Sequence, residues 1–189
     1  MKYDVVVIAG PSGSGKNSVR EGVLEQSNEC VKLVTACTRA MRPGEVEGVD
    51  YYFMTNDQFF DYVDSGEIPE YNEDQWRETQ TTRGVYLPEL KKQIDSGKTV
   101  LAQLQLQGLE YMKKHFNAVG IFIQPSSIKE LEERITSRAD LSEEELKSRL
   151  AIALDEIENQ AKHYDFQITN HNGKLNDAIK EVLDIIKDD

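Results

Sequence analysis

A glycine-rich segment near the start of the chain has the residue types of a phosphate-binding loop. Gly10, Gly15 and Lys16 match a pattern in which spaced glycines precede a lysine and then a hydroxyl residue. Glycines let backbone N–H groups approach phosphate oxygens, and the lysine adds a mobile positive charge. The next position is Asn17, however, where the pattern expects the Ser or Thr hydroxyl that binds magnesium. The segment therefore predicts phosphate binding, but it lacks the hydroxyl group that would bind magnesium.

The segments on either side of this loop have the patterns needed to position it. A run of β-branched residues ending at Ala9 predicts a buried strand, and residues 16–26 have the pattern of a helix. A strand, a glycine turn and a helix in this order direct unpaired N–H groups and the positive end of the helix toward an anion. The local structure expected here therefore supports the same chemistry.

The rest of the chain alternates apolar runs with helical patterns. Further strands are expected at residues 31–38, 50–55, 99–106, 118–125 and 165–170. The longest helical pattern covers residues 142–164, and Ser142 with Glu145 forms a capping-box signature at its start. This alternation predicts a three-layer α/β fold with a mostly parallel central sheet.

Composition excludes several classes of protein. The chain has 189 residues, 39% of them hydrophobic, and no apolar run approaches the length of a membrane span. Its formal net charge of −12 argues against a general nucleic-acid binder, which needs clustered Lys and Arg. Cys30 and Cys37 lack a zinc-binding spacing and are expected to be free thiols. We expect a single cytoplasmic domain that binds neither membranes nor nucleic acid.

A second group of chemically useful residues lies at 35–53. Arg39 and Arg42, with the hydroxyl of Tyr51, can grip a monophosphate through charge-assisted hydrogen bonds. Here the sequence resembles the guanylate kinases, which carry the pattern T-R-x-x-R-x-G-E-x-x-G-x-D-Y-x-F. The matching residues are Thr38, Arg39, Arg42, Gly44, Glu45, Gly48, Asp50, Tyr51 and Phe53. A third match, at residues 132–150, has arginines at the spacing of the lid in that family.

The resemblance implies a fold and an activity. It implies a P-loop kinase fold in one guanylate-kinase-like domain, 1–189, with a core at about 1–34, 99–125 and 165–189, a small monophosphate-binding subdomain at about 35–98 and a helical lid at about 126–164. It also implies ATP as donor, Mg²⁺ as cofactor, and phosphorylation of GMP or dGMP to the diphosphate. Small nucleotides would be the partners, and the protein would be a monomer or a homodimer.

The resemblance also assigns roles to individual residues. Catalysis would rest on Lys16, Arg134, Arg138 and Arg149. ATP would contact Gly10, Pro11, Ser12, Gly13, Ser14, Gly15, Lys16, Asn17, Ser18 and Asn170. The acceptor would contact Thr35, Arg39, Arg42, Tyr51, Glu70, Arg83 and Gln105. Asn17 would reach the metal through a water molecule.

Several positions depart from the family pattern. The strand at 99–106 carries Gln103 and Gln105 where two aspartates are expected, and neutral amides hold Mg²⁺ less well than carboxylates. Val85 stands where Ser or Thr is usual, and Arg83 stands near the place of a phosphate-binding tyrosine. The segment after Glu70 is also longer than usual. Because a pocket that loses a hydrogen-bond partner loses discrimination, these changes bear on base specificity as well as on the metal.

Two alternatives stay open. One is a ribose 1,5-bisphosphate phosphokinase, a related family that also lacks the aspartate strand but does not usually carry the whole 35–53 segment. The other is a binding module without catalysis, similar to the guanylate-kinase-like domains of scaffold proteins that recognise phosphorylated peptides. Those domains have generally lost the loop lysine, whereas Lys16 is present here.

Overall fold

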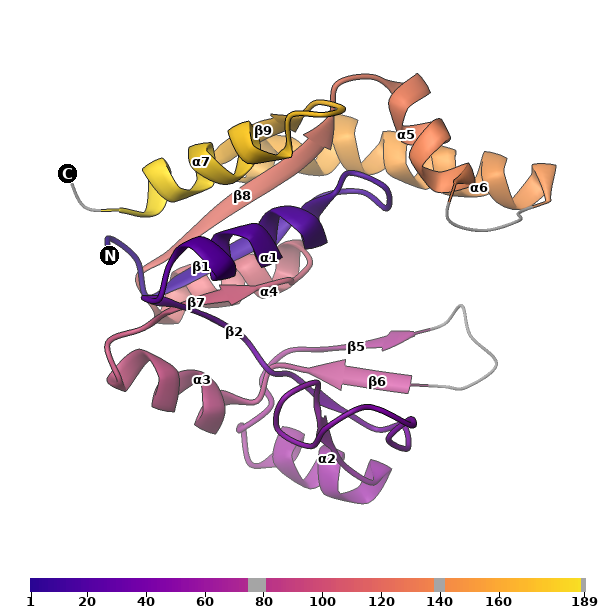
Figure 1. Cartoon of the computed structure of the whole chain (residues 1–189). Helices are drawn as coiled ribbons and strands as arrows, with labels where there is room; N and C mark the ends of the chain where they lie inside the picture. The colour runs from indigo at the N-terminus through magenta and orange to yellow at the C-terminus, as the bar shows by residue number, and fades with distance from the viewer. Residues whose placement is uncertain (75–80, 138–141, 188–189) are drawn as a thin grey trace. The chain divides into compact units, whose positions relative to one another are not determined.

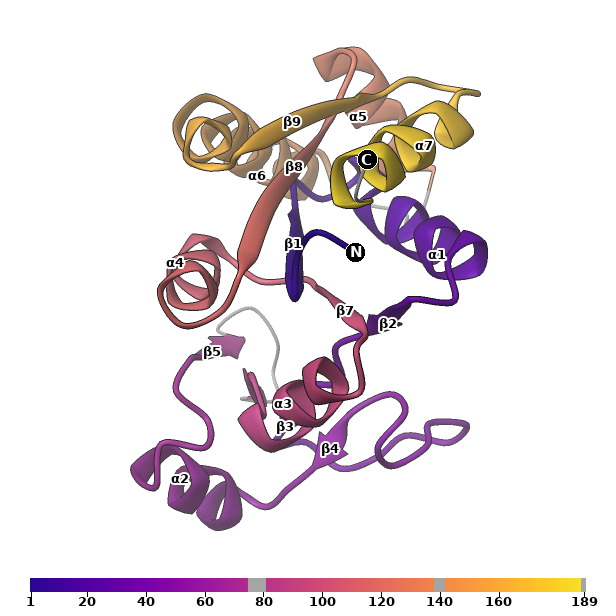
Figure 2. The same cartoon turned by 90° about the vertical axis from the view of Figure 1, so that its left-hand side faces the viewer.

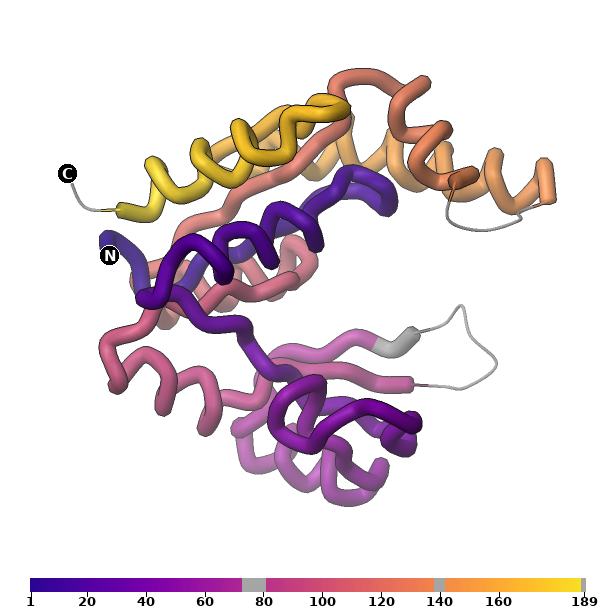
Figure 3. Tube along the Cα trace, viewed as in Figure 1, coloured from indigo at the N-terminus to yellow at the C-terminus, as the bar shows by residue number. Residues whose placement is uncertain are grey.

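The computed structural model describes residues 1–74, 81–137 and 142–187. The chain forms two compact units, one made of residues 1–31 and 101–189 and the other of residues 32–100. The backbone leaves the first unit after Val31 and returns to it at Leu101. The colours of Figure 3 follow the chain along this course, from indigo at the N-terminus to yellow at the C-terminus. The first unit is therefore built from two stretches of sequence. The finer division into core, monophosphate-binding subdomain and lid stays a prediction.

The larger sheet has five strands and confirms the expected α/β class. Its spatial order is β2 (Cys30–Lys32), β7 (Thr99–Ala102), β1 (Val5–Ala9), β8 (Ala118–Pro125) and β9 (Phe166–Asn170). β1 pairs in parallel with β8, and β8 pairs in parallel with β9. All five residues of β1 are buried, as expected for a strand with both faces covered by helices.

Helices cover both faces of this sheet. In Figure 2, α1 (Lys16–Gln26) and α7 (Leu175–Ile186) lie together on one face, while α4 (Leu106–His115) lies on the opposite face. Gly22 of α1 permits the close packing with α7, because a Cβ there would lie 2.1 Å from the Cδ1 of Ile179. The core combines β-branched residues of β1 and β8 with the apolar side of α7. These layers bring the carboxyl end of β1, where the glycine loop begins, to one edge of the first unit (Figure 1).

The helical region after β8 is interrupted in ways that periodicity did not reveal. It contains α5 (Ile128–Thr136), α6 (Glu143–Asp155), a π-helical turn (Glu156–Gln160) and a 3₁₀ turn (Ala161–His163). The expected capping box is present, because the Ser142 Oγ accepts from the Glu145 N–H at 3.2 Å and the Glu145 carboxylate accepts from the Ser142 N–H at 2.9 Å. The single helix expected over residues 142–164 is therefore wrong only in its last part.

The smaller sheet lies in the second unit. Its order is β4 (Tyr52–Phe53), β3 (Ala36–Cys37), β6 (Thr81–Gly84) and β5 (Tyr71–Asp74). The helices of this unit are α2 (Asn56–Asp64) and α3 (Leu87–Asp95), and Phe59 of α2 packs with Ile68 and Ala36 in a small core. Gly84 faces this core, since a Cβ there would lie 2.5 Å from the Cγ2 of Ile68.

Three expected strands are shorter than predicted. The strand expected at 50–55 is limited to β4, Tyr52–Phe53. The run at 31–38 is divided between β2 of the larger sheet and β3 of the smaller one, because the chain passes from one sheet to the other after Lys32. The run at 99–106 ends as a strand at Ala102, where the polar Gln103 follows, and α4 begins at Leu106. Within the described residues, no helix has the length and apolar character required to cross a membrane.

Candidate functional site

The glycine loop between β1 and α1 is closely packed against neighbouring strand ends. Gly10 has φ of 142°, and a Cβ there would lie 2.0 Å from the carbonyl oxygen of Ile123 in β8. Gly15 has φ of 88°, and a Cβ there would lie 2.2 Å from the Nδ2 of Asn170 in β9. Both positions therefore need glycine for conformation and for space. The matched spacing of the sequence pattern reflects these two close approaches.

The end of the loop leaves backbone donors at the start of α1. Gly15 is the N-cap and, within the described part of the chain, no side chain caps the first turn. Uncapped N–H groups and the positive end of the helix attract anions. The Lys16 Nζ donates to the Pro11 carbonyl at 3.2 Å, so the lysine folds back over the loop. The loop, the helix end and the lysine therefore place several hydrogen-bond donors next to one another.

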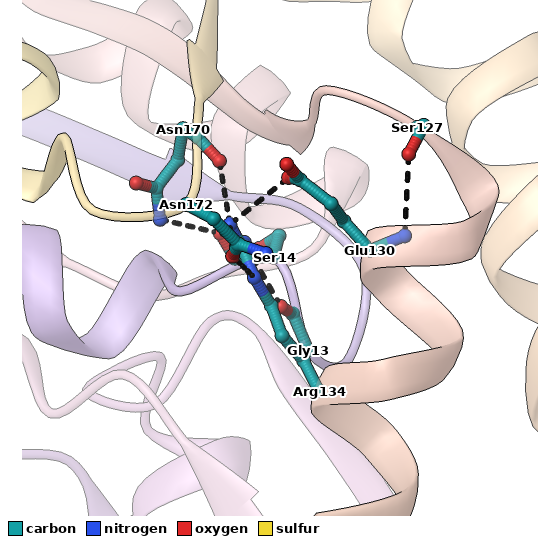
Figure 4. A network of polar contacts seen from close by, with 7 residues as sticks. All are labelled: Gly13, Ser14, Ser127, Glu130, Arg134, Asn170 and Asn172. Atoms are coloured by element: carbon teal, nitrogen blue, oxygen red, sulfur yellow. Dashed lines mark hydrogen bonds and ion pairs between the residues drawn. The ribbon is translucent and has the colours of Figure 1, made fainter.

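Arg134 of α5 fixes this loop to β9 (Figure 4). Its Nη1 donates to the Ser14 carbonyl at 3.2 Å, and its Nη2 donates to the Asn170 carbonyl at 2.8 Å. Its Nε and Nη2 both donate to the Oδ1 of Asn172, at 2.9 and 2.8 Å. The Asn170 side chain adds a 2.9 Å hydrogen bond from Nδ2 to the Ser14 carbonyl. Three segments distant in sequence are thus joined around one guanidinium.

A pocket of about 230 Å³ opens beside this network. It is lined by Gly15, Ser18, Arg134, Asn170, His171, Asn172, Gly173 and Leu175. Three of these, Gly15, Ser18 and Asn170, are residues that the sequence placed at an ATP site, and a fourth, Arg134, was expected to take part in catalysis. Asn172 was missed, although its place two positions after Asn170 was a usable signal. The pocket combines amide and guanidinium groups with an apolar side chain, that of Leu175.

A half-buried carboxyl group, that of Glu156, lies close enough to the loop lysine to feel its charge. Burial raises the pKa of Glu156, which lies in the π-helical turn, while the positive charge of Lys16 opposes that rise. Burial, and to a smaller extent the charge of Glu156, raises the pKa of Tyr164 to about 12. The sequence analysis did not single out Glu156. Asn159 and Gln160 follow it one turn later, so the local sequence carries no pattern that marks Glu156.

The residues at the expected metal position do not fit a protein-bound magnesium ion. The Gln103 Nε2 donates to the Asn17 Oδ1 at 2.6 Å, so the amide oxygen nearest to the loop is already engaged. Both side chains are neutral, whereas Mg²⁺ in proteins is bound through carboxylates and water. In residues 1–74, 81–137 and 142–187, no group of three or more His, Cys, Asp or Glu side chains is arranged to hold a metal ion.

The second unit gathers the arginines expected to bind an acceptor phosphate. The Arg39 guanidinium makes a two-pronged pair with Glu45 and lies 5.2 Å from the centre of the Tyr51 ring. The hydrogen bond from Arg39, and then the one from the Arg42 N–H, lowers the pKa of Glu45 to about 2. The Arg83 guanidinium lies 5.6 Å from the same ring. Arg39, Arg83 and Tyr51 therefore meet, and the Arg42 backbone joins them through Glu45.

Glu70 lies immediately before β5 in the same unit. Burial raises the pKa of Glu70, and its Oε1 accepts from the Asn72 Nδ2 at 3.1 Å. Asn72 is opposite Arg83 in the register of β5 and β6, so Glu70 and Arg83 belong to neighbouring strand positions. Val85 is completely buried, which explains why an apolar residue is tolerated there. Thr35 is half-buried just before β3.

Two further expected residues are not brought into these clusters by any contact in the described part of the chain. Arg149 is exposed on α6, and Gln105 is exposed at the N-cap of α4. Arg138 lies outside the described residues. The catalytic roles expected for Arg138 and Arg149 stay predictions.

Comparisons with known proteins agree with this arrangement. The family model described as guanylate kinase matches residues 2–189. A guanylate kinase of Trichormus variabilis is 39% identical over 88% of this chain and 81% of its own length, and one of Enterococcus faecalis is 34% identical over 96% and 87%. The crystal structure of guanylate kinase from Anaplasma phagocytophilum superposes with a TM-score of 0.66 at 29% identity, covering 98% of this chain and 86% of that one.

Proposed function

This chain belongs to the guanylate kinase family, and from that premise we propose that it transfers the γ-phosphoryl group of ATP to GMP, giving ADP and GDP. The observation that carries the proposal is the loop at residues 10–16, with its glycines packed against β8 and β9 and Lys16 folded over it. Such a loop at an uncapped helix end binds the phosphates of a nucleoside triphosphate.

The donor would bind in the first unit. The phosphates of ATP would lie on the N–H groups of the loop and the start of α1, close to Lys16, and the base would enter the pocket beside Arg134 and Asn170. ATP carries Mg²⁺ on its own phosphate oxygens as part of the substrate. Arg134 is then a positioning residue, because its donors are directed at the carbonyl groups of the loop and of β9.

The acceptor would bind in the second unit. Arg39 and Arg83 beside Tyr51 would hold the 5′-phosphate, since guanidinium groups suit phosphate geometry. Glu70 would accept hydrogen bonds from the N1 and N2 groups of guanine. The half-buried Thr35 would add a hydroxyl group at the base.

The transfer needs two phosphates held in line and a concentration of positive charge. A phosphate oxygen of GMP forms a bond to the γ-phosphorus of ATP while the bond from that phosphorus to the bridging oxygen of ADP breaks. Lys16 stabilises the charge that develops on the transferred group, and the lid arginines Arg138 and Arg149 are proposed to add to it. The attacking phosphate oxygen of the GMP dianion carries no proton, so the proposed mechanism needs no general base.

A ribose 1,5-bisphosphate acceptor is the second candidate. The observation that favours it is Arg83, which adds a second guanidinium at Tyr51 and so increases the positive charge available to an acceptor with more than one phosphate. We favour GMP over ribose 1,5-bisphosphate because the chain carries the 35–53 segment, in which Glu45 holds Arg39 in place.

The test measures ADP formation from ATP and magnesium with GMP, dGMP, AMP, UMP, CMP and ribose 1,5-bisphosphate as separate acceptors. We expect turnover with GMP or dGMP, and its loss in Lys16→Ala. Lys180→Ala, which removes an exposed lysine of α7, is the matched control and should keep the wild-type rate. Turnover with ribose 1,5-bisphosphate alone would replace the GMP assignment. No turnover, with ATP still bound, would favour a binding module.

A further inference from the structure

Two neutral amide side chains are hydrogen-bonded to each other at the place where a magnesium-binding hydroxyl and carboxylate are expected. We propose that the hydrogen-bonded pair Asn17–Gln103 takes the place of magnesium-binding side chains and holds the loop without an ion, so that metal-free ATP binds about as well as its magnesium complex. The proposal rests on the ATP site proposed above and specifies its ligand. It concerns nucleotide affinity, and the rate of transfer is a separate quantity.

The two amides meet because of where the fold puts them. Asn17 lies in the first turn of α1, immediately after Lys16, and Gln103 directly follows β7. β7 is the neighbour of β1 in the larger sheet, and the loop starts at the end of β1. The 2.6 Å hydrogen bond thus joins the loop side of α1 to the neighbouring strand end. This connection spans 86 residues of sequence.

These are the positions from which P-loop enzymes commonly bind magnesium. A hydroxyl after the loop lysine and an aspartate on a neighbouring strand normally hold the ion. In such a site the metal links the two side chains and neutralises the carboxylate. Here the link is a direct hydrogen bond between neutral groups. The hydrogen bond from Gln103 uses one of the two lone pairs of the Asn17 Oδ1, and neither amide carries the negative charge that would attract an ion.

The missing carboxylate changes the electrostatics of the nucleotide site. A carboxylate near the phosphates repels metal-free ATP, and Mg²⁺ ordinarily removes that repulsion. With Gln103 the repulsion from that position is absent, while Lys16 and the helix end still attract the phosphates. Restoring a carboxylate a few ångströms from the phosphates should weaken metal-free binding by about tenfold or more. Binding of the magnesium complex should change much less.

The test is calorimetric titration of ATP into the full chain, once with magnesium and once with EDTA at matched ionic strength. For the wild type we expect dissociation constants within about threefold of each other in the two media. For Gln103→Asp, and for Asn17→Ser combined with Gln103→Asp, we expect a difference of about tenfold or more in favour of magnesium. Gln26→Asp makes the same chemical change on an exposed residue at the other end of α1, and should behave as the wild type.

Two further variants allow the proposal to be tested even if Gln103→Asp does not fold or another residue binds the metal. Asn17→Asp is nearly isosteric and places the carboxylate on the other partner, so it replaces Gln103→Asp if that protein does not fold. Glu156→Gln removes the carboxyl group that lies close to Lys16. Magnesium dependence in the wild type that disappears in Glu156→Gln would overturn the proposal by assigning the metal to Glu156.

The outcomes separate this proposal from the function on which it rests. A wild-type dissociation constant that rises by tenfold or more in EDTA would overturn the amide-pair proposal and leave ATP binding intact. Absence of ATP binding in both media would overturn the proposal and the assigned function together. Equal affinity in both media for the wild type and for Gln103→Asp would also contradict the electrostatic argument.

Discussion

Removal of the Arg134 side chain should destabilise the first unit markedly. The two shortest contacts of its guanidinium, to the Asn170 carbonyl and the Asn172 amide oxygen, are both 2.8 Å long. Hydrogen bonds from charged donors contribute about 1.5–3 kcal/mol each, and because the side chain is 16% exposed we take the lower value for both. Arg134→Ala should therefore lower the free energy of unfolding by about 3 kcal/mol. For a chain of this size, that corresponds to roughly 6–12 °C in Tm.

The assay is thermal unfolding of the nucleotide-free protein, followed by circular dichroism. Arg149→Ala is the matched control, because Arg149 is exposed on α6 and its removal should change stability by less than about 0.5 kcal/mol. Arg134→Lys keeps the charge but lacks the planar fork that reaches several acceptors, so it should recover only a small part of the loss. Equal Tm values for Arg134→Ala and Arg149→Ala would refute the view that this guanidinium fixes the loop.

Three smaller changes test other parts of the structure. Gly15→Ala should strongly weaken ATP binding, measured by calorimetry, because its Cβ would lie 2.2 Å from the Asn170 Nδ2; wild-type affinity would contradict the close packing. The pKa of Glu45 is lowered from 4.5 to about 2, so its contribution to stability is present above pH 4.5 and is lost as the pH falls toward 2. Denaturation of Glu45→Gln should therefore show less loss of stability over that interval than the wild type, and parallel pH curves would count against the pair with Arg39. The pKa of Glu156 is raised, so its ionisation costs stability as the pH rises through that pKa, and Glu156→Gln should be more stable than the wild type at pH 8 but not at pH 4. A variant less stable at pH 8 would mean that the attraction to Lys16 outweighs burial.

Local sequence was sufficient for the parts of the molecule whose structure is decided by neighbouring residues. The glycine loop could be predicted because Gly10 and Gly15 are required by positive φ and by close packing, and both requirements leave the same mark in the sequence. The α6 capping box could be predicted because Ser142 and Glu145 satisfy each other within one turn. The parallel strand β8 matched its apolar run because it is buried on both faces.

Features that depend on tertiary neighbours could not be predicted in the same way. The apolar run at 31–38 carries no sign that its ends belong to different sheets, since apolar character records burial and not the identity of the partner strand. The bond between Asn17 and Gln103 joins residues 86 positions apart, and only the order of strands brings them together. Sequence reasoning identified each as a departure from a pattern. Only the folded structure shows that Asn17 and Gln103 bind each other, so that the two departures form one altered metal position.

The central claim is that the chain transfers a phosphoryl group between nucleotides. Phosphorus NMR of a mixture of ATP, GMP and magnesium with the purified protein tests it most directly, because each product has its own resonances. We predict that ADP and GDP appear in equal amounts as ATP and GMP are consumed, and that no inorganic phosphate accumulates. An unchanged spectrum, or ADP formed with inorganic phosphate and without GDP, would contradict the account.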